Sequence, residues 1–226
     1  MTTSFSRRPV AVAALAALAL CGAIAHAGQL AVSSYDMTNG DGQAHGGTYN
    51  YWDAGYTGSG AATTDGLSGS TLSGGTGKLT DGVIATDPWY DASNSAGTGQ
   101  YVGWLNPNAP TITFHFAGSQ HVDELKLYVD NSHVGGVTAP DAVIVDGTSF
   151  ANPAWTNAST PELIDLTGLG IVGDSVTVTL SDPTLWVFLS EAQFFSNATA
   201  VPEPGNAGLM LGALSLFGAV ARRRRS

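Results

Sequence analysis

The sequence predicts an all-β body, an antiparallel β-sandwich of the jelly-roll type, with a signal helix before it and a single transmembrane helix after it. Apolar residues of the body recur at the period of two that half-buried strands require. Gly, Pro and Asp turns separate these short runs, and no part of the body shows a convincing amphipathic helical pattern. Many short strands joined by turns are typical of sandwiches.

Eight segments of the body are expected to be strands. In the clearest one, Ile112, Phe114 and Phe116 face one side while Thr113 and His115 face the other. The other segments also hold apolar residues that can face a core. In chain order, the expected strands are 30–35, 101–105, 111–116, 122–129, 142–145, 175–180, 185–189 and 191–195.

The stretch 57–77 differs from the rest of the body. It is rich in Gly, Ser and Thr and has few large apolar residues. Such a composition offers little to a core and favours turns, so we expect a long loop here.

The first 27 residues have the pattern of a secretory signal peptide. Arg7 and Arg8 precede an apolar run at 10–20, and Ala25 and Ala27 form an A-x-A cleavage site. Cys21 suggests a lipoprotein signal as the alternative, but the residue before such a cysteine is normally small and here it is Leu20. Cleavage after Ala27 removes the only cysteine, so the exported body, residues 28–200, has no disulfide.

Residues 201–226 form a tail of three parts. An uncharged stretch at about 205–221 is near the lower limit of length for a helix that crosses a bilayer. Four arginines after it would stay on the cytoplasmic side. The extended motif before the stretch is Val201, Pro202, Glu203 and Pro204, and the basic stop is Arg222, Arg223, Arg224 and Arg225.

This tail resembles the PEP-CTERM sorting signal of Gram-negative bacteria that make exopolysaccharide. The resemblance implies a precursor anchored in the inner membrane, processing by an exosortase, and delivery to the cell surface or extracellular matrix. The alternative is an ordinary C-terminal anchor with a basic stop.

The exported body is strongly acidic. Residues 28–200 contain seventeen acidic residues, all those of the chain except Glu203, against only Lys78 and Lys126, a net charge near −15. Such a surface repels the phosphates of nucleic acids and anionic lipids, so we expect no nucleic-acid partner. It suits divalent cations and neutral polymers, although acidity can also serve solubility alone.

Four short motifs follow one another in the body. Residues 78–82 read Lys-Leu-Thr-Asp-Gly, 101–104 read Tyr-Val-Gly-Trp, 125–129 read Leu-Lys-Leu-Tyr-Val, and 190–194 read Ser-Glu-Ala-Gln-Phe. In this order they resemble the discoidin or coagulation-factor type of galactose-binding-like jelly-roll domain. The resemblance covers residues 78–196 well and 28–77 poorly.

The second resemblance implies a structural calcium ion where the Asp-Gly loop meets the last strand. Calcium takes six to eight oxygen ligands from carboxylates and carbonyls. The positions carried over are Asp81 and Glu191, with the carbonyl of Lys78 and the oxygen of Thr86 as additions. The alternative is that Asp81 only caps the turn before Gly82.

Aromatic residues in turn-rich segments are the candidates for sugar binding, because flat rings stack on pyranose rings. These are Trp52, Trp89, Tyr90 and Trp155. Trp104 and Trp186 lie in apolar strands and are expected in the core. The body has no arginine, which is a common donor to sugar hydroxyls.

The sequence predicts a protein that is not an enzyme. It has no Gly-x-Ser-x-Gly or His-Glu-x-x-His motif and no cysteine nucleophile after cleavage. We expect an exported surface or matrix protein that interacts with polysaccharide. The alternatives are a purely structural or adhesive matrix component and, less favoured, a polysaccharide-active enzyme.

Overall fold

The computed structural model describes residues 28–42, 48–63, 69–105, 109–151, 159–181 and 185–196. All of them belong to one compact unit, His26–Val201. The predicted signal peptide with its helix, the cleavage site, the sorting motif, the expected transmembrane helix at about 205–221 and the basic stop lie outside the described residues. Within the described ranges, none of the helices combines the length and apolar character that a bilayer crossing needs.

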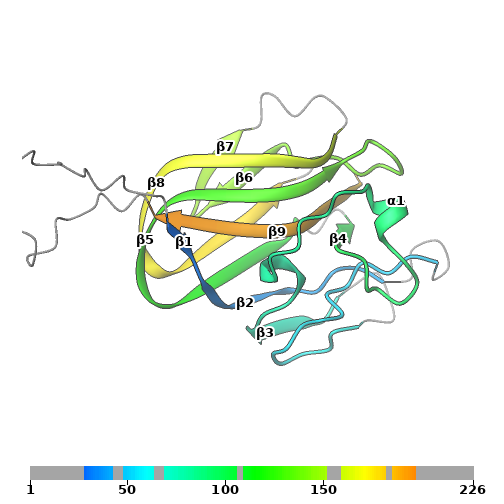
Figure 1. Cartoon of the computed structure of the whole chain (residues 1–226), viewed down its shortest axis with the longest axis horizontal. Coiled ribbons are helices and arrows are strands. Elements are labelled where there is room, and N and C mark those ends of the chain that lie inside the picture. Colours follow the sequence, from blue (N-terminus) through cyan, green and yellow to red (C-terminus); the bar gives the residue numbers. More distant parts are fainter. Residues whose placement is uncertain are drawn as a thin grey trace, which may run out of the picture. The chain divides into compact units, whose positions relative to one another are not determined.

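The predicted fold class is confirmed, since the described strands form one antiparallel nine-stranded sheet that folds over on itself (Figure 1). Its main order is β1-β9-β5-β8-β6-β7, with β2 joined to β5, β3 to β2 and β4 to β9. The strands are β1 (Gly28–Leu30), β2 (Val32–Thr38), β3 (Thr71–Gly75), β4 (Val102–Leu105), β5 (Thr111–Asn131), β6 (Ala142–Val145), β7 (Thr148–Ala151), β8 (Ser159–Ser181) and β9 (Trp186–Ser196). The two short helices are η2 (Lys78–Thr80) and α1 (Trp89–Ala92).

The long strand β5 makes the sandwich. Its first half pairs with β2, from Ile112 to Phe116, and its second half pairs with β9, from Glu124 to Val129. Strand β8 follows β5 along both halves. A strand that changes partners in this way passes from one layer to the other, which closes the core.

Several predicted boundaries are wrong. The expected strands 111–116 and 122–129 are one strand, β5, because a register shift between His115 and Gln120 carries the pairing with β8 across the polar stretch between them. Strand β9 likewise joins 185–189 to 191–195. The expected loop 57–77 contains strand β3, which pairs with β2. The expected strand 175–180 is only the end of β8, and the expected strand 30–35 is divided between β1 and β2. The sequence reading also missed β7, η2 and α1.

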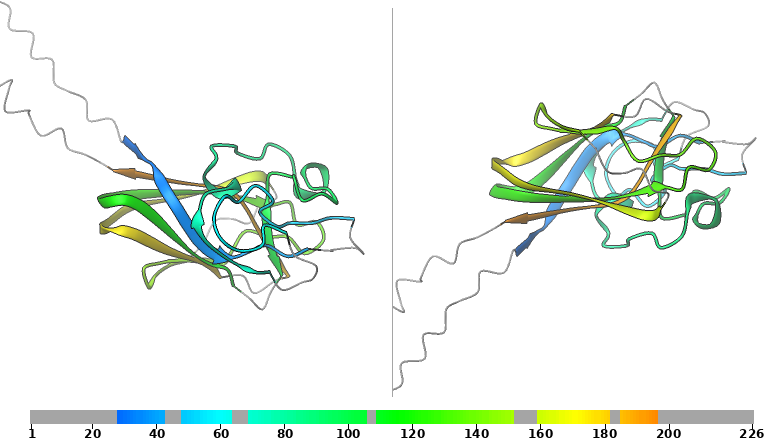
Figure 2. Two further views of the ribbon diagram at one scale, coloured as in Figure 1. Left: turned by 90° about the horizontal axis from the view of Figure 1, so that it is seen from below. Right: turned by 90° about the horizontal axis from the view of Figure 1, so that it is seen from above.

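Two clusters of buried residues form the core. The larger contains Ile112, Phe114 and Phe116, whose inward direction is confirmed. The smaller lies under the loops on either side of α1 and is built around Trp89 and Phe188; its buried members are Tyr51, Ala85, Trp89, Tyr101, Val137 and Phe188. These loops gather at the end of the sheet away from the start of β1 and the end of β9 (Figure 2).

Candidate functional site

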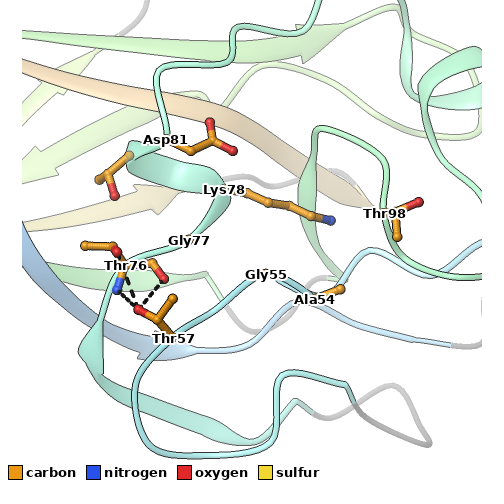
Figure 3. Close-up of a pocket in the computed structure, with 9 residues that line it drawn as sticks. Ala54, Gly55, Thr57, Thr76, Gly77, Lys78, Asp81 and Thr98 are labelled. Atoms are coloured by element: carbon orange, nitrogen blue, oxygen red, sulfur yellow. Dashed lines mark hydrogen bonds between the residues drawn. The ribbon is translucent and has the colours of Figure 1, made fainter.

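A pocket of about 460 Å³ opens between three loop segments near η2. That volume suits a small ligand or one or two sugar rings, since ligand sites usually enclose about 300 to 1,000 Å³. Four threonines and one carboxylate line its wall, and no aromatic ring is among the described lining residues (Figure 3). The lining residues are Ala54, Gly55, Thr57, Thr76, Gly77, Lys78, Thr80, Asp81 and Thr98.

One rim of the pocket is fixed by two threonines from separate segments. The backbone N–H of Thr57 donates to the carbonyl of Thr76 at 2.9 Å, and the backbone N–H of Thr76 donates to Oγ1 of Thr57 at 3.0 Å. The Thr57 hydroxyl in turn donates to the Thr76 carbonyl at 3.1 Å (Figure 3). Because both segments are tied by backbone and side chain, this rim is held ready for a ligand.

The floor is built on the buried carboxylate of Asp53. One of its oxygens accepts a hydrogen bond from the Tyr35 hydroxyl, and the other accepts one from the backbone N–H of Lys78 at 3.1 Å. Burial raises the pKa of Asp53, while these two hydrogen bonds and the charge of Lys78 oppose the rise. Gly77 must be glycine here, since an added Cβ would lie 2.4 Å from Oδ2 of Asp53.

The ammonium group of Lys78 is enclosed by backbone carbonyls. Its Nζ donates to the carbonyls of Trp52 at 2.8 Å, Gly97 at 2.6 Å and Tyr101 at 3.4 Å. The residue is only 8% exposed. Burial lowers the pKa of Lys78 to about 8, and the charges of Asp53 and Asp81 oppose this. The ammonium therefore ties two loop segments, one at Trp52 and one at 97–101, to η2.

The predicted calcium ligands Asp81 and Glu191 belong to segments that the fold brings together. The buried Glu191 accepts a hydrogen bond from the backbone N–H of Gly82 at 3.2 Å. The alternative role of Asp81 is also present, because its Oδ1 accepts from the backbone N–H of Val83 at 2.8 Å. Burial raises the pKa of Glu191 to about 7, and the charge of Asp81 adds to the rise.

The surroundings of this pair fit a hard cation in part. Oγ1 of Thr80 is buried without a hydrogen-bond partner, and Thr80 lines a second pocket of about 350 Å³ together with Glu191. The hydroxyl of Thr86 instead donates to its neighbour Asp87 at 3.1 Å. Among the described residues no group of three His, Cys, Asp or Glu side chains converges. Hydroxyl, carbonyl and water oxygens would have to complete the site.

The structure corrects two of the four aromatic candidates. Trp52 and Trp89 are buried, at 9% and 5% exposed. Trp89 belongs to the second core cluster, whereas Trp52 packs against the loop at Gly97, where an added Cβ would lie 2.0 Å from its Nε1. Neither can offer a ring face to a sugar. Tyr90 is 39% exposed and remains a candidate, while Trp155 lies outside the described residues. Of the two expected core tryptophans, Trp104 is buried and Trp186 is half-buried.

Sequence reading missed most of the pocket. Thr57 and Thr76 lie in the segment expected to be a loop, and Thr98 carries no motif. Lys78 was singled out only for its carbonyl. The signal that could have indicated a special role is that Lys78 is one of only two basic residues in an acidic body.

Comparison with known families gives one match. The family described as "Discoidin domain-containing receptor 1/2, DS-like domain" matches residues 31–196. The chain belongs to this family. The match includes 31–77, where the motifs alone covered the chain poorly, and so places strands β2 and β3 within the DS-like domain. A search of curated proteins finds no match.

Solved structures of low identity resemble this DS-like protein. One is from the Streptococcus pneumoniae β-galactosidase BgaA, with 11% identity, a TM-score of 0.36, and coverage of 53% of this chain and 83% of that one. Another is the family 32 carbohydrate-binding module of Clostridium perfringens NanJ in complex with galactose, with 10% identity, a TM-score of 0.30, and coverage of 50% and 87%. A third is a chitosan-binding module from Paenibacillus sp. IK-5, with 12% identity, a TM-score of 0.36, and coverage of 76% and 100%.

Proposed function

We propose that this DS-like protein is an exported, non-enzymatic component of the cell surface or extracellular matrix that binds polysaccharide in the pocket beside η2. The observation that carries the proposal is the pocket itself, in which threonine side chains and Asp81 line a space of about 460 Å³. Hydroxyl and carboxylate groups on rigid segments are suited to the hydroxyls of a sugar. Hydrolysis of a glycoside usually uses two carboxylates, whereas Asp81 is the one carboxylate among the described lining residues.

Binding can be tested with purified protein and a panel of polysaccharides that includes the exopolysaccharide of the producing bacterium. Thr98→Val and Thr76→Val remove a rim hydroxyl while keeping the side-chain shape, so each should weaken binding several-fold. Thr167→Val is the matched control, because Thr167 is exposed on β8 and does not line the pocket. Binding by wild type that neither rim variant weakens would exclude this pocket. Failure of wild type to bind any polysaccharide would leave the structural or adhesive role.

We also propose delivery by an exosortase at the inner membrane. The support is the sequence of the tail, with Pro202, Glu203 and Pro204 before an uncharged stretch and four arginines. Replacing these three residues by alanine should leave unprocessed precursor in the membrane fraction. Normal release of that variant would show that the tail is only an anchor.

A calcium ion held by Asp81 and Glu191 is the third part of the proposal. Its support is the approach of the Gly82 turn to Glu191 together with the unpartnered hydroxyl oxygen of Thr80. When bound, the ion would pin the turn to β9 in a body that has no disulfide. Because a ligand of the native state raises stability by mass action, calcium should raise the melting temperature relative to chelator, and Glu191→Gln should reduce that rise. An unchanged melting temperature at saturating calcium would disprove the site.

A further inference from the structure

We propose that the pocket discriminates by charge, rejecting polysaccharides with carboxylate or sulfate groups and favouring neutral chains and chains with protonated amino groups. This inference rests on the proposed function and specifies the class of glycan. It follows from how the few basic residues of the body are used.

Lys78 is the only basic side chain among the described residues that line the pocket, and its ammonium group donates to backbone carbonyls of the protein. An ammonium group has three N–H donors and no acceptor. In Lys78 the carbonyls of Trp52 and Gly97 accept two of them at 2.8 and 2.6 Å, the carbonyl of Tyr101 lies 3.4 Å from Nζ, and the residue is buried beneath the surface. A carboxylate on a sugar could take one of these donors only by breaking a hydrogen bond that holds two loop segments together.

Lys126, the second basic residue of the body, pairs with acidic side chains away from the pocket. Nζ of Lys126, on β5, lies 2.8 Å from Oε1 of Glu124 and 3.9 Å from Oδ2 of Asp165. It also lies 4.8 Å from the centre of the Phe195 ring, and it does not line the pocket. Residues 28–200 contain no arginine and no third lysine. An anionic sugar therefore has no lysine or arginine partner in the body.

The charge that the pocket does present is negative. Asp81 is exposed at the wall, and one of its oxygens accepts from the backbone N–H of Val83. A carboxylate can accept further hydrogen bonds, so it can receive a sugar hydroxyl or, more strongly, an ammonium group. The threonine hydroxyls can serve either type of sugar, so the selection comes from Asp81 and the acidic surroundings.

The test is a binding comparison of three polymers: a neutral glucan, a polyuronate and a partly deacetylated amino-sugar polymer. Chelator is present throughout, so that no divalent cation masks Asp81. At low salt the amino-sugar polymer should bind best and the polyuronate worst, with steps of about tenfold that shrink as salt is added.

Two variants and a control locate the selection. Asp81→Asn should weaken the amino-sugar polymer and strengthen the polyuronate, while Asp174→Asn makes the same change in net charge on β8, outside the pocket, and should do neither. Thr98→Lys adds an ammonium at the wall and should increase binding of the polyuronate. It also provides an independent test if Asp81→Asn does not fold.

The outcomes separate this inference from the proposed function. If wild type binds none of the polymers and no polysaccharide of the wider panel, the proposed function fails. If it binds the polyuronate as tightly as the neutral glucan, the function stands and charge discrimination is wrong. Equal effects of Asp81→Asn and Asp174→Asn would overturn the assignment to the pocket, because net charge alone would then explain the preference.

Discussion

Replacing Lys78 by methionine tests whether the enclosed ammonium holds the pocket loops together. Methionine has a similar length and fills much of the same space, so the change removes mainly the charge and the three N–H donors. The carbonyls of Trp52, Gly97 and Tyr101 lose a shared donor, and the buried carboxylate of Asp53 loses the positive charge that opposes the rise in its pKa.

The expected cost follows from the geometry. A hydrogen bond from a charged donor contributes about 1.5 to 3 kcal/mol to stability. The bonds from Nζ to the carbonyls of Trp52 and Gly97, at 2.8 and 2.6 Å, are short enough for each to contribute an amount in this range. The contact at 3.4 Å to Tyr101 adds little. Two effects offset part of this loss: the variant no longer bears the desolvation cost of burying an ammonium group, and it buries the apolar side chain of methionine instead. We expect the free energy of unfolding to fall by about 3 kcal/mol.

Urea denaturation of the purified protein, followed by tryptophan fluorescence, measures this change. Lys126→Met is the matched control, because that lysine pairs only at the surface and should contribute no more than about 1 kcal/mol. The melting temperature of Lys78→Met should fall by roughly 10 °C for a domain of this size. A loss no larger than that of Lys126→Met would refute the role of the ammonium.

Two further changes test the surroundings. Burial raises the pKa of Asp41 to about 6, so the native protein binds a proton on this carboxyl more tightly than the unfolded chain does. The protonated carboxyl therefore stabilises the native state below about pH 4, and this stabilisation is lost as the pH rises through about 6. Asp41→Asn keeps an acceptor for the backbone N–H of Leu105. In urea denaturation at neutral pH this variant should be more stable than wild type by up to about 3 kcal/mol. Equal stability of the two proteins would contradict the raised pKa of Asp41. Gly97→Ala should cost about 2 to 3 kcal/mol, because φ is +67° there and the new Cβ would lie 2.0 Å from Nε1 of Trp52; a loss below about 0.5 kcal/mol would show that the loop can shift.

The faces of the strands could be predicted because the period of two is a local property. Ile112, Phe114 and Phe116 are buried as the alternation indicated. The length of β5 could not be predicted, because the small and polar residues between its halves resemble a turn. Pairing with β8 on both sides of that stretch continues the strand, and such pairing is decided by the partner.

The exposure of side chains in the loops could not be predicted from the sequence either. Trp52 and Trp89 stand in turn-rich segments, which normally lie at the surface. Trp89 is buried because a second cluster of aromatic residues forms where the loops meet β9, and the aromatic ring of Phe188 lies 6.0 Å from that of Trp89. Trp52 is buried against the loop at Gly97, where an added Cβ would lie 2.0 Å from its Nε1. The approach of Glu191 to the Gly82 turn could be anticipated, since the resemblance to the discoidin type of domain implied it.

Local pattern therefore determined the β class and the inward faces of the strands, and the family resemblance implied the meeting of the Asp-Gly loop with the last strand. The pocket was decided by the tertiary structure alone, since its walls come from three segments that only the folded sheet brings together. Burial decided the role of Lys78 as well. Nothing near it in the sequence shows that carbonyls 26, 19 and 23 residues away would enclose its ammonium group.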